Sequence, residues 1–189
     1  ADPDQVVLTS PGDSSTENYI LYIDETTNTI IDGVSFAPTG AYARSVVVKG
    51  NSDYTTIQNC RFAGTVNTNT SNAEHIYFIN DGDSDSDYVI IQDNDFLDGD
   101  YHININSTSY NNNFSNWQIQ NNTHTGGYGG IYLCRASDME ISGETMTAVN
   151  AGIYLNSCDG AISIHTNNVS AFATGLYIEY SDTYDTGIP

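Results

Sequence analysis

Short apolar segments recur along the chain, and each has the alternation of a β-strand. One element starts on isoleucine, continues through polar residues and closes on an apolar or aromatic residue five positions later. A segment this short with a period of two predicts a strand rather than a helix. Clear copies occupy 31–36, 57–62, 91–96 and 119–124, and weaker copies start at Ile141 and Ile164.

A second element alternates with the first and places one outward residue between two apolar ones. Successive copies start 26, 30, 27, 28, 22 and 23 residues apart. A repeat of this length, with two strand segments and a short third one near the closing aromatic residue, is typical of one solenoid coil. The copies are Ile20-Leu21-Tyr22, Val46-Val47-Val48, Ile76-Tyr77-Phe78, Ile103-Asn104-Ile105, Ile131-Tyr132-Leu133, Ile153-Tyr154-Leu155 and Leu176-Tyr177-Ile178.

The repeats predict an all-β fold, a parallel β-helix of about seven coils in a single domain over 1–189. Coils about 4.8 Å apart would give a core roughly 30 Å long. The alternation turns Ile, Leu, Val and Phe inward and the residue between them outward. Ile76, Ile103, Ile131 and Ile153 are therefore expected to be vertical neighbours.

Turns and loops are expected between these strands. Asn59, Asp93 and Asn121 fall at equivalent positions just after a strand. Stacked side chains there can hydrogen-bond along the axis and satisfy the turn backbone. The varying coil length predicts that loops bulge outward, the largest over 63–73, 81–87 and 106–116.

The Ile-x-Asn-x-x-Phe and Gly-Ile-Tyr-Leu motifs resemble the right-handed β-helix repeat proteins of the pectin-lyase-like superfamily, including the NosD-like repeat group. The resemblance covers nearly the whole chain and implies a right-handed helix. Enzymes, adhesins and phage spikes share these motifs, so the resemblance implies an architecture and no single activity.

The charge balance restricts the partners. Four Lys and Arg stand against 24 Asp and Glu, which gives a formal net charge of −20. Such a surface should repel nucleic acids and anionic membranes, and no stretch is apolar for the roughly 18 residues that a membrane span needs. The acidic surface favours cations and neutral, hydroxylated partners.

Secretion or display at the cell surface is the expected localisation. Five N-x-S/T sequons, which can accept N-glycans in an exported protein, give it weak support. The odd number of cysteines excludes a fully paired framework within one chain. Cys134 and Cys158 could pair if neighbouring coils bring them together, and a buried free-thiol role is equally open for Cys60, Cys134 and Cys158. The sequon asparagines are Asn69, Asn106, Asn113, Asn121 and Asn168.

An acidic corner is the first candidate site. His75 and His102 precede equivalent isoleucines, so they are expected to stack as neighbours and to face outward. With Glu74, Asp98 and Asp100 close in sequence, the corner could bind a metal or run acid–base chemistry on a sugar. A polysaccharide-active site would also include Asp95. A solvated polar ladder would show the same pattern.

A run of alternating aspartates is the second candidate site. Asp81, Asp83, Asp85 and Asp87 supply the oxygen ligands that Ca²⁺ prefers. The run lacks the turn glycine and the bidentate glutamate of an EF-hand, so it predicts at most a calcium-stabilised loop. A solvated acidic loop is the alternative.

A row of tyrosines is the third candidate site. Tyr77, Tyr132, Tyr154 and Tyr177 share one outward register, which Asn104 interrupts. Exposed aromatic rings can stack on sugars or pack against another protein. Tyrosine is also a good strand residue, so the row could be structural.

The chain lacks the catalytic motifs of the polygalacturonase-like and pectate-lyase-like enzymes of the family that it resembles. It has no Asn-Thr-Asp, Gly-His-Gly or Arg-Ile-Lys, and no Arg-x-Pro-x-x-Arg. The leading hypothesis is therefore an extracellular structural or adhesive module, which could stack end to end with itself or with further coils into a fibre. A polysaccharide hydrolase or lyase, or a glycan-binding module, is the alternative.

Overall fold

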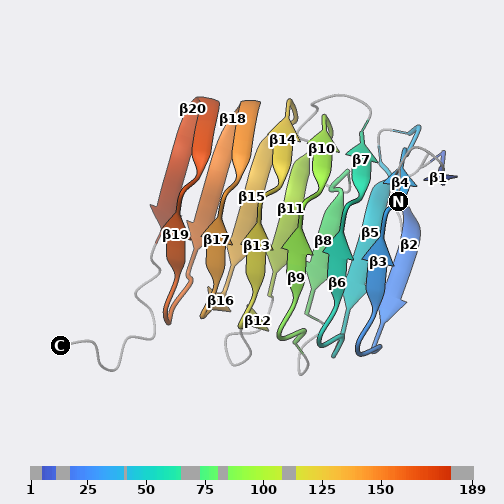
Figure 1. Cartoon of the computed structure of the whole chain (residues 1–189), viewed down its shortest axis with the longest axis horizontal. Coiled ribbons are helices and arrows are strands. Elements are labelled where there is room, and N and C mark those ends of the chain that lie inside the picture. Colours follow the sequence, from blue (N-terminus) through green and yellow to red (C-terminus); the bar gives the residue numbers. More distant parts are fainter. Residues whose placement is uncertain are drawn as a thin grey trace.

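The computed structural model describes residues 6–11, 18–40, 42–64, 73–80, 85–107 and 114–179. These residues form a stack of short parallel strands, with the N-terminal strands at one end and β19 and β20 at the other (Figure 1). Nowhere in these ranges is there a helix long and apolar enough to cross a membrane. The predicted all-β solenoid is confirmed.

The second sequence element forms one continuous row of strands. Ile76 pairs with Ile103, Ile103 with Ile131, and Ile131 with Ile153, so the predicted vertical neighbours are confirmed. The described part of this row has one strand for each of the seven copies. Its strands are β2 (Tyr19–Asp24), β5 (Arg44–Lys49), β8 (Ile76–Ile79), β11 (Tyr101–Asn106), β15 (Gly129–Cys134), β18 (Thr145–Asn156) and β20 (Asn168–Glu179).

The first sequence element supplies the two other rows. Its isoleucines lie in a six-stranded sheet, so the described chain makes about six full turns and begins a seventh. This sheet contains β3 (Ile30–Asp32), β6 (Thr56–Gln58), β9 (Ile90–Gln92), β13 (Gln118–Gln120), β17 (Glu140–Ser142) and β19 (Ser163–His165).

The third row follows a tight turn after each of these strands. Its strands are β1 (Val7–Leu8), β4 (Ser35–Phe36), β7 (Arg61–Ala63), β10 (Asp95–Leu97) and β14 (Thr123–Thr125), and it continues into the first halves of β18 and β20. The short strands β12 (Phe114–Ser115) and β16 (Ala136–Ser137) pair at another corner.

The first copy of the second element is shifted by one residue from its predicted position. Leu21 pairs with Val46 and Ile23 with Val48, so the copy is 21–23 and not 20–22. The shift turns the phenolic ring of Tyr22 outward, where it is 38% exposed, and buries Ile23. Solvation of the tyrosine hydroxyl and burial of the isoleucine both favour this register.

Aromatic rings from the third row of strands point into the core and fill this corner. Phe36, Phe62 and Phe96 stack at 5.0 and 4.8 Å between ring centroids, and His124 continues the stack 5.0 Å from Phe96. Each ring lies over the one in the previous coil because the strands pair in register. The core is therefore a set of ladders that run along the axis.

The tight turns use left-handed backbone. Asn59, Asp93 and Asn121 have φ of 52°, 55° and 56°, a conformation that Asn and Asp adopt more easily than other non-glycine residues. Asn59 donates to Asp32 across one coil at 2.9 Å, as the axial bonding predicts. A second, buried row lies one residue later, at Asn94 and the positions stacked on it.

Candidate functional site

The two histidines of the predicted acidic corner stack as expected, but they point inward. Their rings lie 5.4 Å apart, and the exposed fractions of His75 and His102 are 1% and 0%. The expectation that they face outward is wrong. The ring of His102 lies 5.6 and 5.2 Å from the rings of Phe96 and His124, so His102 and the next residue of β11, Ile103, both face the core.

Hydrogen bonds fix the protons on these rings. Nε2 of His75 and Nε2 of His102 lie 2.7 and 3.1 Å from the carbonyl oxygen of Asp98, so each Nε2 donates. The neutral ring of His102 must then accept at Nδ1. Nδ1 of His124, 3.0 Å away, is the donor to it.

The chain of hydrogen bonds ends on a buried carboxylate. Nε2 of His124 lies 2.7 Å from Oε2 of Glu144, and both side chains have no exposed surface. The backbone N–H and the side-chain amide of Asn122 donate to Oε1 of Glu144 at 3.2 and 3.0 Å. Asn122 in turn accepts from Asn94 at 3.0 Å. This buried chain satisfies its own polar atoms and stabilises the core.

Burial also sets the charge of two of the imidazoles. It lowers the pKa of His75 to about 4 and that of His102 well below its usual value, because a charged ring would lose its hydration. Both rings are therefore neutral at pH 7 and sealed from solvent. A general acid or base must reach its substrate, so this geometry does not support a catalytic role for the pair.

The three aspartates of the corner do not converge with the histidines. Asp95 is exposed and lies 4.0 Å from Nε of Arg61, whereas Asp98 contributes its backbone carbonyl. Asp100 is buried, and burial together with the charge of Glu74 raises its pKa to about 7. Within the described ranges, no three His, Cys, Asp or Glu side chains are grouped so as to hold a metal ion.

The acidic run is only partly described, since Asp81 and Asp83 lie outside the described residues. Asp87 accepts hydrogen bonds from the backbone and hydroxyl of Ser115, both at 2.9 Å, and so holds a turn of the next coil. Burial, followed by the charges of Asp87 and Asp53, raises the pKa of Asp85 to about 6. Calcium binding here stays a prediction.

The tyrosine row lies in the predicted outward register, but its rings cover one another. Tyr132, Tyr154 and Tyr177 stack at 5.1 and 4.6 Å. Tyr77 is buried beneath the guanidinium of Arg44, which lies 4.1 Å from the ring centroid. Ring faces in this row are occupied by neighbours, so it presents mostly ring edges until Tyr177, the last ring of the stack.

The cysteines and sequons do not form a site. Cys60, Cys134 and Cys158 are free thiols, and burial raises the pKa of each. Asn121 and Asn168 are exposed and Asn106 is partly exposed. Asn69 and Asn113 lie outside the described residues.

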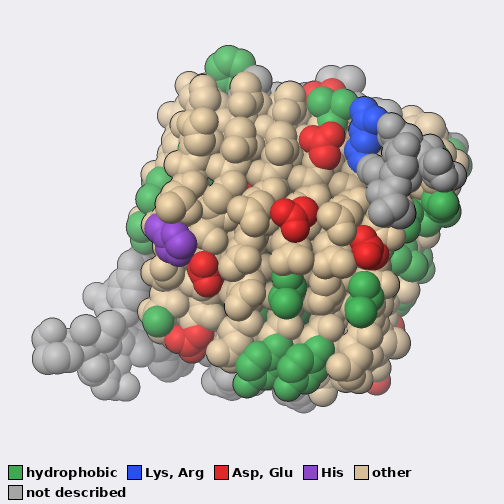
Figure 2. Space-filling view, viewed as in Figure 1, with side chains coloured by type: hydrophobic (Ala, Val, Ile, Leu, Met, Phe, Trp, Pro, Cys, Tyr) green, Lys and Arg blue, Asp and Glu red, His purple; other side chains and the backbone are tan. Residues whose placement is uncertain are grey.

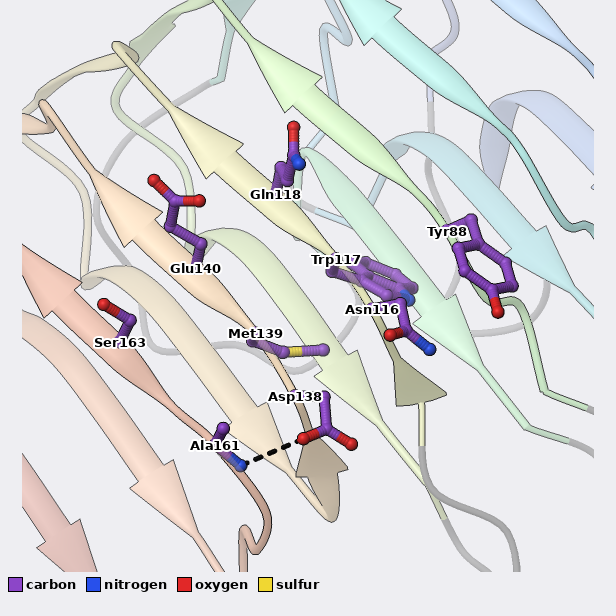
Figure 3. Close-up of a pocket in the computed structure, with 9 residues that line it drawn as sticks. All are labelled: Tyr88, Asn116, Trp117, Gln118, Asp138, Met139, Glu140, Ala161 and Ser163. Atoms are coloured by element: carbon purple, nitrogen blue, oxygen red, sulfur yellow. Dashed lines mark hydrogen bonds between the residues drawn. The ribbon is translucent and has the colours of Figure 1, made fainter.

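A groove that the sequence did not predict runs along the axis over β13, β17 and β19 (Figure 3). We call it the axial groove, and its volume is about 460 Å³. Trp117 and Met139 form its buried floor. Its walls are Tyr88, Asn116, Asp138 and Ala161 on one side and Gln118, Glu140 and Ser163 on the other.

The groove arises from a row of left-handed residues that precede the strands of the six-stranded sheet. Along the axis these are Asn28, Tyr54, Tyr88, Asn116, Asp138 and Gly160, with φ between 50° and 67°. The ring of Tyr88 is followed in this row by the smaller side chains of Asn116 and Asp138 and then by Gly160, which leaves a hollow. A tyrosine or asparagine three residues before the Ile in each of the four clear copies of the first element was the available signal.

The last described coil, which ends at Glu179, exposes its apolar side chains. Leu176 and Ile178 are 50% and 66% exposed, whereas the stacked residues Ile153 and Leu155 are 2% and 4% exposed. The side chains around this end enclose an apolar hollow of about 360 Å³. They are Leu155, Cys158, Ile162, Ile164, Leu176, Ile178 and Glu179.

Charged side chains are sparse on the face that Figure 2 shows. On the face that carries the six-stranded sheet, acidic side chains are scattered singly, and Lys and Arg appear only near the N-terminal end (Figure 2). Hydrophobic side chains gather at the lower edge of the same face.

Comparison with known proteins gives the family and the handedness. The profile of the family described as "Right handed beta helix region" matches residues 18–186. No curated protein and no solved structure shows a significant match to the chain. Coils, ladders and profile agree, and the chain belongs to the right-handed β-helix family.

Proposed function

We propose that this protein is an extracellular structural module whose open C-terminal coil pairs with the first coil of a second copy. The observation that carries the proposal is the exposure of Leu176 and Ile178, since the same positions in the preceding coil are buried. An unpaired parallel edge with an apolar cross-section is stabilised when another coil covers it.

The N-terminal end offers a matching surface. The triplet Leu-Tyr-Ile occurs at 21–23 in β2 and again at 176–178 in β20, with the same in–out pattern. A second copy stacked in register would place Tyr22 over Tyr177 and continue the tyrosine row. Pairing of one end with the other is head to tail and leads to open filaments.

Charge opposes this association. Each copy carries a formal charge of −20, and the in-register arrangement places Glu179 beside Asp24 of the next copy. Salt screens such repulsion, with a Debye length of about 3 Å at 1 M. Association is therefore expected to strengthen as salt concentration rises.

Sedimentation velocity of the whole chain at rising concentration tests the proposal. We expect oligomers that the double variant Leu176→Asp, Ile178→Asp disperses to monomers. Phe172→Asp is the matched control, because Phe172 is 78% exposed on the same strand. A wild-type monomer at high concentration and high salt, or dispersal by Phe172→Asp alone, would contradict end-to-end pairing.

A further inference from the structure

The axial groove has an aromatic side chain, Tyr88, at one end and polar side chains along its length. We call these polar side chains the rails, and they are Asn116, Gln118, Asp138, Glu140 and Ser163. Tyr54 covers one face of the Tyr88 ring, with the centroids 5.0 Å apart and the rings 5° from parallel. Tyr54 lies in the coil before Tyr88 and the groove in the coils after it. The second face of the Tyr88 ring therefore borders the groove, and Tyr88 is 48% exposed.

The backbone conformation at Tyr54 and Tyr88 is unfavourable for a tyrosine. Tyr54 and Tyr88 both have φ of 56°, whereas the same row uses Asn28, Asn116 and Asp138 elsewhere. Asn and Asp tolerate left-handed backbone, and a bulky ring there costs free energy. Two neighbouring tyrosines kept in this conformation with exposed rings are a feature that a purely structural turn does not need.

The rails supply both donors and acceptors. Asn116, Gln118 and Ser163 carry groups that donate, and Asp138 and Glu140 carry carboxylates that accept. Each carboxylate already has protein partners. Asp138 accepts from the backbone N–H of Ala161 at 3.0 Å, and Glu140 accepts from the hydroxyl of Ser142 at 3.2 Å and lies 3.3 Å from Nε2 of His165. No Lys or Arg is among the described residues that line the groove.

We propose that the axial groove binds an uncharged, linear oligosaccharide, with one sugar ring packed on the free face of Tyr88. Sugar hydroxyls both donate and accept, which the mixed rails satisfy, and the apolar face of a sugar ring packs on an aromatic ring. An anionic ligand would meet Asp138 and Glu140. A cationic ligand would leave the donors on Asn116, Gln118 and Ser163 unused.

The groove carries its own probe, since Trp117 is the only tryptophan of the chain and forms the floor. The experiment is a fluorescence titration of the full chain with cellohexaose, maltohexaose and mannohexaose, with hexalysine as the cationic competitor. We expect a saturable change with at least one of the sugars and none with hexalysine.

Matched variants locate the response. Tyr88→Asn places a residue that suits left-handed backbone, and we expect it to weaken binding at least about tenfold while the urea unfolding midpoint is retained. Tyr54→Asn and Tyr177→Ala, which remove rings that do not line the groove, should each change affinity less than about threefold, well below that tenfold loss.

A second variant protects the test against a folding failure. Asn116→Gly removes one rail side chain at φ 59°, where glycine is unstrained, and should also weaken binding. A saturable response to hexalysine alone, no response to any of the three sugars, or full affinity in both Tyr88→Asn and Asn116→Gly would overturn the proposal.

Discussion

At the scale of single residues, the core of this protein tolerates polar groups because each has a partner in the next coil. His124 takes the position that Phe36, Phe62 and Phe96 hold in earlier coils. Its partner Glu144 takes the position of Asn94 and Asn122. The histidine and the glutamate replace a phenylalanine and an asparagine together, and either change alone would leave a buried polar group without a partner.

Replacing His124 alone should therefore be costly. His124→Phe removes the partner of Oε2 of the buried Glu144 carboxylate and the donor to Nδ1 of His102, and we expect the free energy of unfolding to fall by about 3 kcal/mol. The double variant His124→Phe, Glu144→Asn restores the residue pair of other coils and should recover the part of that loss that belongs to Glu144, although His102 still lacks its donor. Urea denaturation measures both, and a double variant as unstable as the single one would contradict this account.

The buried histidines and Asp100 respond to pH in opposite directions. Folded His75 takes up its proton only near pH 4, but the unfolded side chain does so near 6.5, so acidification in this window favours unfolding. Folded Asp100 keeps its proton up to about pH 7, whereas the unfolded carboxyl releases it near 3.8. Acidification between those values therefore favours the folded state.

Asp100→Asn should separate these two effects. The variant removes a carboxyl that is costly to ionise, so we expect it to be more stable than the wild type at pH 8 by about 1 kcal/mol or more. Below pH 6.5 the stability of the variant should fall more steeply than that of the wild type, by up to about 1.4 kcal/mol per pH unit, because the variant lacks the carboxyl whose protonation offsets the effect of the histidines. In urea curves from pH 8 to 4.5, equal slopes for the two proteins would contradict the raised pKa of Asp100, and a variant whose stability does not fall with acidification would argue against buried, neutral histidines.

At the scale of elements, the glycines before the second sequence element let the coils approach closely. A Cβ on Gly152 would lie 2.3 Å from the carbonyl oxygen of Gly175, and one on Gly130 would lie 2.8 Å from the sulfur of Met146. A Cβ on Gly175, in the last coil, would meet nothing within 4 Å. These glycines continue the row that begins with His75 and His102. In the early coils the imidazole rings fill the space at this position, and in the later coils the side chain of Met146 and the backbone of the next coil fill it.

This contrast gives a matched pair of variants. Gly152→Ala forces a Cβ against backbone and should lower the free energy of unfolding by about 2 kcal/mol or more. Gly175→Ala, the same change one coil later, should leave it within about 0.5 kcal/mol. Thermal or urea unfolding of both decides, and equal losses would mean that the last coil is not open.

The rows of strands could be predicted because each ladder repeats the same alternation. Ile76, Ile103, Ile131 and Ile153 share a register that sequence spacing alone reveals. The direction of His75 and His102 could not be predicted, because the residue before the inward isoleucine also faces the core there, as His102 and Ile103 show within one strand. Alternation is the only directional signal in the sequence, and it fails at corners.

The axial groove escaped prediction for a related reason. It is formed by turn residues such as Tyr88 and Asn116, which belong to neither repeated element. Their common backbone conformation becomes visible only when the coils are stacked. The pairing of His124 with Glu144, 20 residues apart, likewise depends on the coil length between them.

At the scale of the whole molecule, the structure is a short rod whose ladders run from one end to the other. The inward apolar ladders of the described chain are covered except at the two ends of the rod, and Leu176 and Ile178 at the C-terminal end are 50% and 66% exposed. The exposed core positions of the rod therefore lie at its two ends, and we expect it to associate end to end.

Small-angle X-ray scattering at increasing protein and salt concentration tests this claim most directly. The account predicts that the particle length increases in steps of one rod while the radius of gyration of the cross-section stays constant. A cross-section that widens with concentration, or a length that stays at one rod under all conditions, would contradict coil-on-coil pairing of the two ends.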